Sequence, residues 1–450
     1  MLHKVLGSMF GKFEHGEIKK FGILAAIFGL VIGVYWAMRP IKDSIFGAIV
    51  GIDYQPQAKW ISLLVIVPLV ILYGKLIDMF PRHKMFYLFV GFYGILALFF
   101  AWAFQHPTLG LSNTVEDPYR IIGWAWYIYV ESFGSLIVAL FWAITTDITT
   151  EDAAKRGFPL IALGGQMGNI FGPLFLRAER LGFEHSGPMV NIIAALIFGM
   201  GILMYVFMRV IPASQLIGYQ KEHHIKEEKE PGFLEGLKLL FTKPYLMGIF
   251  LVITIYEIIV TVFDFHFKAM AKAAFPLERA NAEYLANYAV WTGVIATICV
   301  LLGINSIQRR LGMVSSLLLM PILVAGAVVG LWFYPTIGAA FWIMVIAKAV
   351  NYALNQPTMK QLYIPTTKET KYKSQAWIEM FGSRGAKAGG SAINAFRGMF
   401  KAKYGAVAGI TAFLTLSSGI SLSLIGVWLF VVTYVAKTYN KAIKEEKVVC

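Results

Sequence analysis

Apolar runs of about 20 residues recur along the whole chain and alternate with short polar connections. A helix needs about 20 apolar residues to cross the hydrocarbon core of a bilayer, so each run predicts a membrane-spanning α-helix. The runs predict twelve spans, near residues 21–38, 60–80, 85–104, 121–146, 158–176, 190–210, 246–266, 286–306, 313–333, 338–357, 376–399 and 406–436. The pattern therefore predicts an all-α polytopic membrane protein.

One long polar connection divides the predicted spans into two sets of six. It carries the charge run Lys221–Glu230, which we interpret as a solvated cytoplasmic helix without chemistry. Two six-helix halves with a central cytoplasmic linker are the plan of major-facilitator transporters. The predicted parts are an amphipathic N-terminal segment, the first half, the linker, the second half and a cytoplasmic tail, at 1–20, 21–211, 212–244, 245–437 and 438–450.

The composition agrees with a membrane protein, since 58% of the residues are hydrophobic, 15% are charged and the mean hydropathy is +0.64. Lysine and arginine gather in alternate connections, which places both termini in the cytoplasm by the positive-inside rule. We attribute the net charge of +14 to this topology and not to nucleic-acid binding. Two cysteines exclude a disulfide framework, and no zinc-ligand spacing occurs, so we expect no metal or cofactor.

The fifth and eleventh spans resemble one another. Gly164–Asn169 in the fifth corresponds to Gly382–Lys387 in the eleventh, and Gln166 and Asn169 are the uncharged counterparts of two cations. In the same way Glu131 in the fourth span corresponds in position to Lys348 in the tenth. Two such matches favour an internal repeat with a cavity-facing site in each half.

The stretch 376–400 carries Arg384 and Lys387 at membrane depth, among several glycines. Each cation costs about 2.5–3.5 kcal/mol there on insertion scales, so such residues usually face a cavity, a counter-ion or a ligand. Glycine lets another group approach the backbone closely. We interpret this stretch as an anion-binding face; the alternative is that both side chains snorkel to the interface.

The first span ends near a lysine. Pro40 is expected to interrupt the helix, so that Lys42 faces a cavity. The alternative is an ordinary basic cap at the membrane edge.

The fourth span has a carboxylate, Glu131, near its middle. It must be neutralised there, either by a proton or by a lysine, and a structural ion pair is the alternative. Of the aromatic residues nearby we assign Trp124 and Trp126 to an interfacial belt. Tyr127 and Tyr129 are left open between this belt and stacking on a planar base.

The seventh and tenth spans hold further polar side chains. Glu257 and Asp264 are seven residues apart and so project from one helix face, and Lys268, four residues beyond Asp264, is placed to pair with it. Lys348 with Asn351 and Asn355 forms a polar stripe in the tenth span. Such stripes line water or substrate more often than lipid.

A cavity lined by these groups would be positively charged, which predicts a polyanionic substrate, since lysine and arginine bind phosphate. The chain has neither a Walker-type loop nor an HExxH motif, so we predict that it is not an enzyme. Transport energy would then come from exchange or from an ion gradient.

Four stretches resemble the ATP/ADP translocase family of intracellular bacteria and plastids. They are Arg39-Pro40-Ile41-Lys42-Asp43; Glu131–Ser135 with Phe141-Trp142; Glu151–Arg156 with Pro159-Leu160; and Lys373–Glu379 followed by Arg384, Lys387 and Gly389-Gly390. The resemblance implies two cavity lysines and two cavity glutamates, which we place at Lys42, Lys387, Glu131 and the acid of the seventh span. That span departs from the family pattern, because Tyr256 leads to Asp264 and Lys268 and an additional Glu257 is present. Either acid can be the functional one.

The predicted function is nucleotide transport by alternating access, as ATP/ADP exchange across a bacterial inner membrane, by a monomer surrounded by lipid. The alternatives are a proton-coupled nucleotide or NAD importer and a major-facilitator transporter for another organic anion. The predicted substrate-binding residues are Lys42, Tyr127, Glu131, Glu257, Asp264, Lys268, Lys348, Asn351, Arg384 and Lys387.

Overall fold

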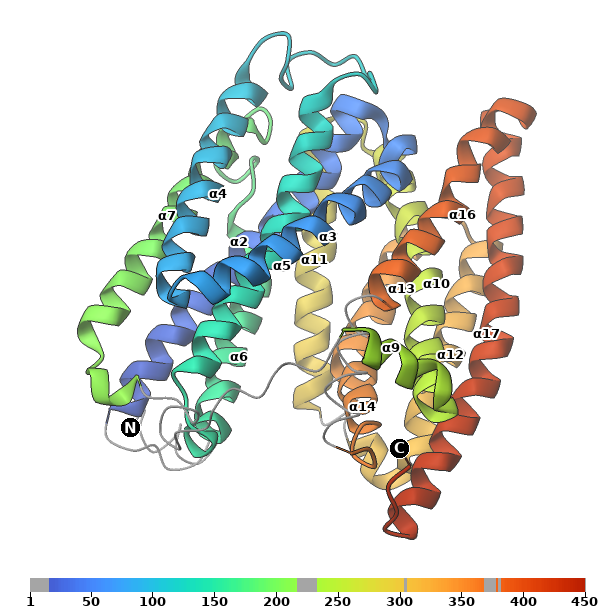
Figure 1. Cartoon of the computed structure of the whole chain (residues 1–450). Coiled ribbons are helices and arrows are strands. Elements are labelled where there is room, and N and C mark those ends of the chain that lie inside the picture. Colours follow the sequence, from blue (N-terminus) through green and yellow to red (C-terminus); the bar gives the residue numbers. More distant parts are fainter. Residues whose placement is uncertain (1–15, 217–232, 303–305, 368–377, 379–381, 450) are drawn as a thin grey trace. The chain divides into compact units, whose positions relative to one another are not determined.

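The structure, a computed structural model, describes residues 16–216, 233–302, 306–367, 378 and 382–449. In these residues helices are the only regular secondary structure (Figure 1), as the apolar runs predict. The predicted N-terminal surface segment up to residue 15, the charge run Lys221–Glu230 and the motif residues Lys373–Trp377 and Glu379 lie outside the described residues.

The chain divides into two compact units. Unit 1 contains the residues up to Ile52, Leu64–Glu228 and Phe275–Val290, and unit 2 contains Asp53–Leu63, Lys229–Ala274 and the residues from Trp291 onward. Two helices, α3 (Gln55–Met79) and α11 (Glu278–Leu301), have residues in both units. The division therefore follows packing and not only the order of the chain.

The remaining α-helices belong wholly to one unit. Those of unit 1 are α2 (Glu17–Phe46), α4 (Arg82–Gln105), α5 (Ile121–Asp147), α6 (Glu151–Phe175) and α7 (Gly187–Val210), with a short π-helix at Gly47–Gly51 and a 3₁₀ turn at Ala213–Gln215. A second 3₁₀ turn, Ile52–Tyr54, lies before α3 and crosses the boundary between the units. Those of unit 2 are α9 (Phe233–Thr242), α10 (Pro244–Ala274), α12 (Ser306–Phe333), α13 (Ile337–Val350), α14 (Gln356–Gln361), α16 (Ser383–Tyr404) and α17 (Ala406–Lys444), with a π-helix at Asn351–Asn355.

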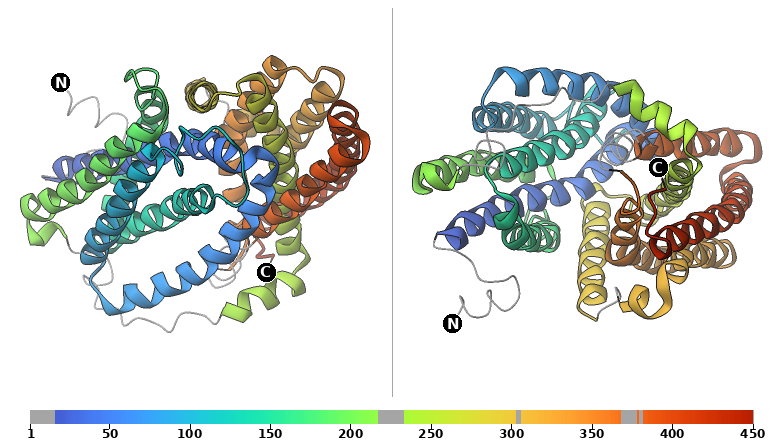
Figure 2. Two further views of the ribbon diagram at one scale, coloured as in Figure 1. Left: turned by 90° about the horizontal axis from the view of Figure 1, so that it is seen from above. Right: turned by 60° about the horizontal axis from the view of Figure 1, so that its bottom comes forward.

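The two units share most of their helix pairings. In unit 1, α2 contacts α5, α6 and α7, while α4 contacts α5 and α7. In unit 2, α10 contacts α13, α16 and α17, while α12 contacts α13 and α17. The pair α16 and α17 lies side by side in each view (Figures 1 and 2). This common pattern matches α2 with α10, α5 with α13 and α6 with α16, in agreement with the repeat inferred from the fifth and eleventh spans.

Helix α2 continues through Pro40 to Phe46, so the expected interruption at this proline is wrong. Proline removes one backbone donor and crowds the carbonyl four residues earlier. Pro40 and the residues that follow it are buried, and α2 packs against three helices of its unit. Packing from neighbouring helices commonly lets a membrane helix keep a proline.

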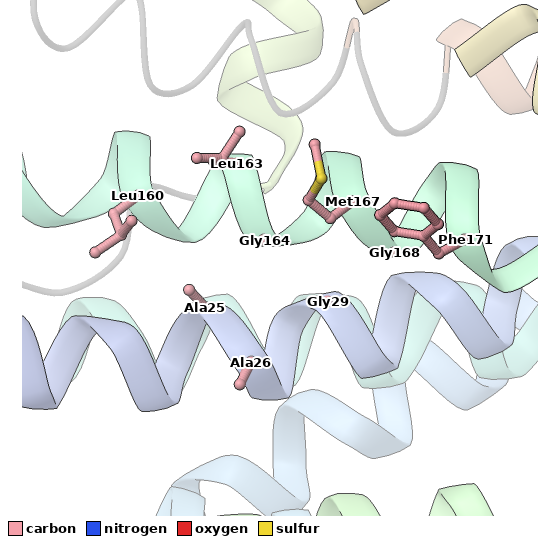
Figure 3. Close-up of a pocket in the computed structure, with 9 residues that line it drawn as sticks. All are labelled: Ala25, Ala26, Gly29, Leu160, Leu163, Gly164, Met167, Gly168 and Phe171. Atoms are coloured by element: carbon pink, nitrogen blue, oxygen red, sulfur yellow. The ribbon is translucent and has the colours of Figure 1, made fainter. Parts of the chain in front are cut away.

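Helices α2 and α6 touch through glycines. A Cβ at Gly168 would lie 2.1 Å from the carbonyl oxygen of Gly29, and one at Gly172 would lie 2.1 Å from that of Gly33. Small residues four apart on both helices let the two backbones meet, as they do in many membrane helix pairs. Figure 3 shows this seam from the side, with a groove of about 380 Å³ lined only by apolar side chains and glycines. The glycines of the fifth span thus have a packing role.

Each predicted span overlaps a helix of the described residues, and nine helical stretches there are long and apolar enough to cross a membrane. One of these stretches, Glu17–Tyr73, contains the first predicted span and the larger part of the second. Helices α6 and α16, at the fifth and eleventh spans, are not among the nine, although they have 25 and 22 residues. They are the two helices whose glycines and polar residues form the internal repeat.

Candidate functional site

Three predicted residues meet in unit 1. The Lys42 ammonium of α2 forms an ion pair with the Glu131 carboxylate of α5 and lies 4.1 Å from the centre of the Tyr127 ring. Asp43 is a second anion, with its Oδ1 atom 3.7 Å from Lys42 Nζ. The lysine side chain is 3% exposed, whereas the Glu131 side chain is 32% exposed. The cation is therefore buried and neutralised, and its carboxylate partner can be reached by a ligand.

The aromatic residues beside Glu131 belong to the core of unit 1. Trp126 is fully buried against Phe104 and Tyr129, so its assignment to an interfacial belt is wrong. Tyr129 donates a hydrogen bond to the backbone oxygen of Tyr93 at 3.0 Å and is almost fully buried. Tyr129 therefore supports α5, and Tyr127 is the tyrosine of this span that contacts the lysine.

A second charge cluster lies in unit 2. Asp264 of α10 receives Lys268 Nζ and Lys348 Nζ, each at 2.7 Å, and all three side chains are nearly buried. The pairing of Lys268 with Asp264, expected from their spacing of four, is confirmed. Two lysines share one carboxylate here, which gives the cluster a formal excess of one positive charge.

The two clusters are related by the internal repeat. In unit 1 the base is on α2 and the acid on α5, whereas in unit 2 the acid is on α10 and a base on α13. Helix α10 matches α2, and α13 matches α5. An ion pair therefore joins the corresponding helices in each unit, but the helices that carry the acid and the base are exchanged. The lysine at the position that matches Glu131 explains why an acid is needed on α10.

Glu257 has different partners from Asp264. Its Oε1 atom accepts a hydrogen bond from Ser383 Oγ at 3.2 Å, and its Oε2 atom is 3.8 Å from Lys387 Nζ. Seven residues of helix advance about 10 Å, so two acids on one face still reach different neighbours. The structure thus pairs Glu257 with the Lys387 side chain, which is 52% exposed, and Asp264 with lysines that are buried.

Glu257 also lines a cavity of about 280 Å³ within unit 2. The cavity is bordered by polar, aromatic and aliphatic side chains from α10, the π-helix, α14, the turn after it and the start of α16. Its lining residues are Val252, Ile253, Tyr256, Glu257, Asn351, Asn355, Gln356, Met359, Lys360, Tyr363 and Ser383. The described lining includes the predicted residues Glu257 and Asn351 but neither Lys348 nor Arg384.

The polar stripe predicted in the tenth span is divided by a change of helix type. Lys348 is still in α13 and pairs with Asp264, whereas Asn351 and Asn355 are in the π-helix and line the cavity. The backbone N–H of Gln356 bonds to the oxygen of Asn351, five residues earlier, just before Pro357. Proline has no N–H and crowds the preceding turn, which explains the wider turn at this point.

A further ion pair in unit 2 was not singled out from the sequence. Arg397 of α16 pairs with Asp53, and Lys401 Nζ lies 2.5 Å from the same carboxylate. The guanidinium of Arg397 is also 5.7 Å from the centre of the Phe265 ring. The sequence did contain a signal for this contact. Arg397 is a third cation inside the predicted eleventh span, and a charge at membrane depth is costly unless it has a partner.

Unit 1 contains a related contact that the sequence did not reveal. Glu278, at the start of α11, accepts hydrogen bonds from Ser44 Oγ at 2.8 Å and from the backbone N–H of Ser186 at 2.9 Å. Arg177 pairs with Glu283 one turn further along α11. The partners in these contacts are far apart in sequence, so no local sequence pattern predicts the contacts.

Comparison with known proteins gives a family and a set of similar folds. The model of the TLC ATP/ADP transporter family matches residues 119–342 and 336–439. Among curated proteins, ADP,ATP carrier protein 1 of Rickettsia prowazekii is 26% identical over 484 residues, with 96% of each chain covered. ADP,ATP carrier protein 3 of Rickettsia bellii is 25% identical and covers 84% of this chain and 87% of its own. The chloroplastic ADP,ATP carrier protein 1 of Arabidopsis thaliana is 25% identical and covers 96% and 76%.

Solved structures with a similar fold are also transporters. A variant of the nucleoside transporter NupG has a TM-score of 0.64 at 15% identity and covers 92% of this chain and 99% of its own. A bacterial homologue of the human lysosomal transporter Spinster has a TM-score of 0.58 at 14% identity, with 95% and 98% covered. At these identities the likeness concerns the fold alone, and it confirms the predicted fold class.

Proposed function

The chain belongs to the TLC ATP/ADP transporter family, and we propose that it carries nucleotides across a membrane by alternating access, as an exchanger of ATP for ADP. The observation that carries the proposal is the match of the family model to residues 119–342 and 336–439. The similar curated proteins are named as carriers of ADP and ATP, which supports the same substrates. The protein acts as a carrier and not as an enzyme.

The lysines of the predicted site would bind the phosphates. Lys42 and Lys387 each have a carboxylate partner that is partly exposed, Glu131 and Glu257 respectively. A phosphate oxygen can replace a carboxylate oxygen at an ammonium with similar geometry and more negative charge. The two acids would therefore neutralise the lysines between substrates and release them when a nucleotide arrives.

The cluster around Asp264 adds positive charge to this scheme. Lys268 and Lys348 share one carboxylate, so one of them can turn to a phosphate while the other keeps its partner. Arg384 of α16 offers a planar fork of donors, which suits a phosphate better than a point charge does. Tyr127 would hold Lys42 in place through its ring.

The membrane and the orientation are part of the proposal. We place the protein in a bacterial inner membrane, with both termini in the cytoplasm, because lysine and arginine are concentrated in the connections on that side. A monomer contains all the residues assigned to substrate.

Release of labelled ADP from preloaded proteoliposomes tests the function. An exchanger releases ADP only when ATP or ADP is supplied outside, because the carrier without substrate does not reorient. Release that needs no external nucleotide and stops when the proton gradient is collapsed would contradict exchange and support proton coupling. Failure of ATP, ADP and NAD alike to drive release would contradict nucleotide transport and leave another organic anion as substrate.

A further inference from the structure

The cavity of unit 2 differs in chemistry from a phosphate site. Its lining is mostly uncharged, with the amides of Asn351, Asn355 and Gln356 and the rings of Tyr256 and Tyr363. The carboxylate of Glu257 faces the same space and would repel a phosphate. Amides, aromatic rings and a single acceptor carboxylate are the groups that recognise the edge and faces of a nucleobase.

The two asparagines hold one another in a fixed arrangement. Asn355 Nδ2 donates to Asn351 Oδ1 at 2.8 Å, and both side chains are more than nine-tenths buried. Within the described part of the chain, neither amide has another side-chain hydrogen bond, so Asn351 Nδ2 and Asn355 Oδ1 stay available. A donor and an acceptor side by side match the edge of a base that carries an amino group beside a ring nitrogen.

Glu257 makes the cavity selective for a donor. Its carboxylate accepts hydrogen bonds only, and Ser383 Oγ of α16 donates one to it at 3.2 Å. An exocyclic amine of a base can donate to it, whereas a carbonyl oxygen at the same position would be repelled. Tyr256, which packs against Trp428 with ring centres 5.9 Å apart, supplies a supported aromatic wall.

The size of the cavity limits what it can hold. Sites for drug-sized ligands occupy about 300–1,000 Å³, so a space of about 280 Å³ suits a ring system and not a whole nucleotide. Lys360 lines the cavity, and Lys387 is next to Glu257. Phosphates would therefore lie outside, near cations, with the base inside.

We propose that this cavity is the nucleobase subsite of the carrier and that Asn351, Asn355 and Glu257 select a base with an exocyclic amine, adenine in particular. The inference rests on the proposed function, since it assigns one part of the nucleotide to one part of unit 2.

Competition among triphosphates that differ only in the base tests the assignment. The full chain in proteoliposomes takes up labelled ATP, and unlabelled ATP, ITP or UTP competes. In ITP a carbonyl oxygen replaces the 6-amino group of ATP. For the unaltered protein we expect ATP to compete about 10-fold better than ITP, as one well-placed pair of hydrogen bonds allows.

Asn355→Leu should reduce this ratio to about 3-fold or less, since it removes the acceptor and releases Asn351. Glu257→Gln keeps the size of the side chain and should reduce the ratio as well, which guards against a folding defect in the first variant. Lys387→Ala should weaken all three triphosphates alike and leave the ratio unchanged. Thr358→Val is the control on α14, because this buried residue bonds to the Leu354 oxygen and is not part of the lining.

An unchanged ratio in both Asn355→Leu and Glu257→Gln would overturn the nucleobase subsite while nucleotide transport stands. Equal competition by all three triphosphates in the unaltered protein would do the same. If the unaltered protein takes up no nucleotide at all, the proposed function is refuted, and the subsite falls with it.

Discussion

Lys42 and Lys387 are both lysines beside carboxylates, but their exposure differs. The Lys42 side chain is 3% exposed and that of Lys387 is 52% exposed. A ligand can thus reach Lys387 directly, whereas at Lys42 it must first displace Glu131. We therefore expect a phosphate to reach Lys387 more readily than Lys42.

Replacing Lys387 or Glu131 should greatly reduce nucleotide transport without preventing insertion of the protein into the membrane. For Lys387→Ala and Glu131→Ala we expect nucleotide uptake at least about 10-fold lower, since truncating one partner of a buried or binding charge pair costs about 2–5 kcal/mol. Uptake into proteoliposomes at equal protein content measures this. The matched controls are Lys155→Ala and Asp152→Ala, an exposed ion pair in which losing either charge should change little. Uptake at the unaltered level by either variant removes that residue from the site.

Helices α10 and α13 are joined by charge as well as by packing. Asp264 lies between two lysines, one on its own helix and one on α13. Breaking a buried ion pair by removing one partner is much more costly than replacing both. The ion pair between Asp264 and Lys348 therefore holds α10 and α13 together as long as both partners are present.

Asp264→Asn should lower the thermal stability of the detergent-solubilised protein, because Lys268 and Lys348 remain buried without their anion. A loss of about 3–5 kcal/mol is typical of such a change. The double variant Asp264→Asn with Lys348→Met should recover part of the loss, since one buried charge is removed. A double variant no more stable than Asp264→Asn would show that the Lys348–Asp264 pair does not couple the helices.

Helices α2 and α6 depend on glycine where their backbones touch. Gly168→Ala places a Cβ 2.1 Å from the Gly29 carbonyl oxygen, which forces the helices apart. Overpacking of this kind costs about 1–3 kcal/mol, so the melting temperature should fall. Gly199→Ala in α7 is the control, because no atom lies within 4 Å of its added Cβ, and it should keep or slightly raise stability. Equal effects of the two substitutions would contradict the close contact.

At the scale of the whole molecule, polar contacts of Asp53 and Glu278 attach short segments to units that the order of the chain does not predict for them. Asp53, part of unit 2 although Ile52 belongs to unit 1, binds Arg397 and Lys401. Glu278 belongs to unit 1 and bonds to Ser44 and Ser186. Each anchor joins residues more than 90 positions apart and fixes one end of a helix that the units share.

The anchor at Asp53 can be measured by a double-mutant cycle. Asp53→Ala, Arg397→Ala and the combined variant should give a coupling energy of about 1–3 kcal/mol in thermal or denaturant unfolding, as residues in one ion-pair network usually do. The Arg397 side chain is nearly buried, so its charge loses a partner in Asp53→Ala. Asp53→Ala should therefore lower stability more in the protein that keeps Arg397 than in the Arg397→Ala variant. Additive effects would show that the contact does not anchor the segment.

The sequence by itself determined the class and the family of the protein and predicted one of its buried ion pairs. Run lengths alone predicted helices at all twelve spans, because the bilayer sets the length of a spanning helix. Short motifs in a fixed order identified the transporter family, which the family model confirms. The spacing of four predicted the pairing of Asp264 with Lys268, since a helix brings such residues onto one face.

Only the tertiary structure decided which partners these residues have. Pro40 does not end α2 and Trp126 is in the core, because packing by neighbouring helices outweighs local preference. Glu257 and Asp264 have different partners, because different groups face the two acids about 10 Å apart along α10. The contacts of Asp53 and Glu278 join distant parts of the chain, and no local pattern records such distances. Helix formation is local and periodic, whereas the neutralisation of a buried charge depends on whichever group the fold brings near it.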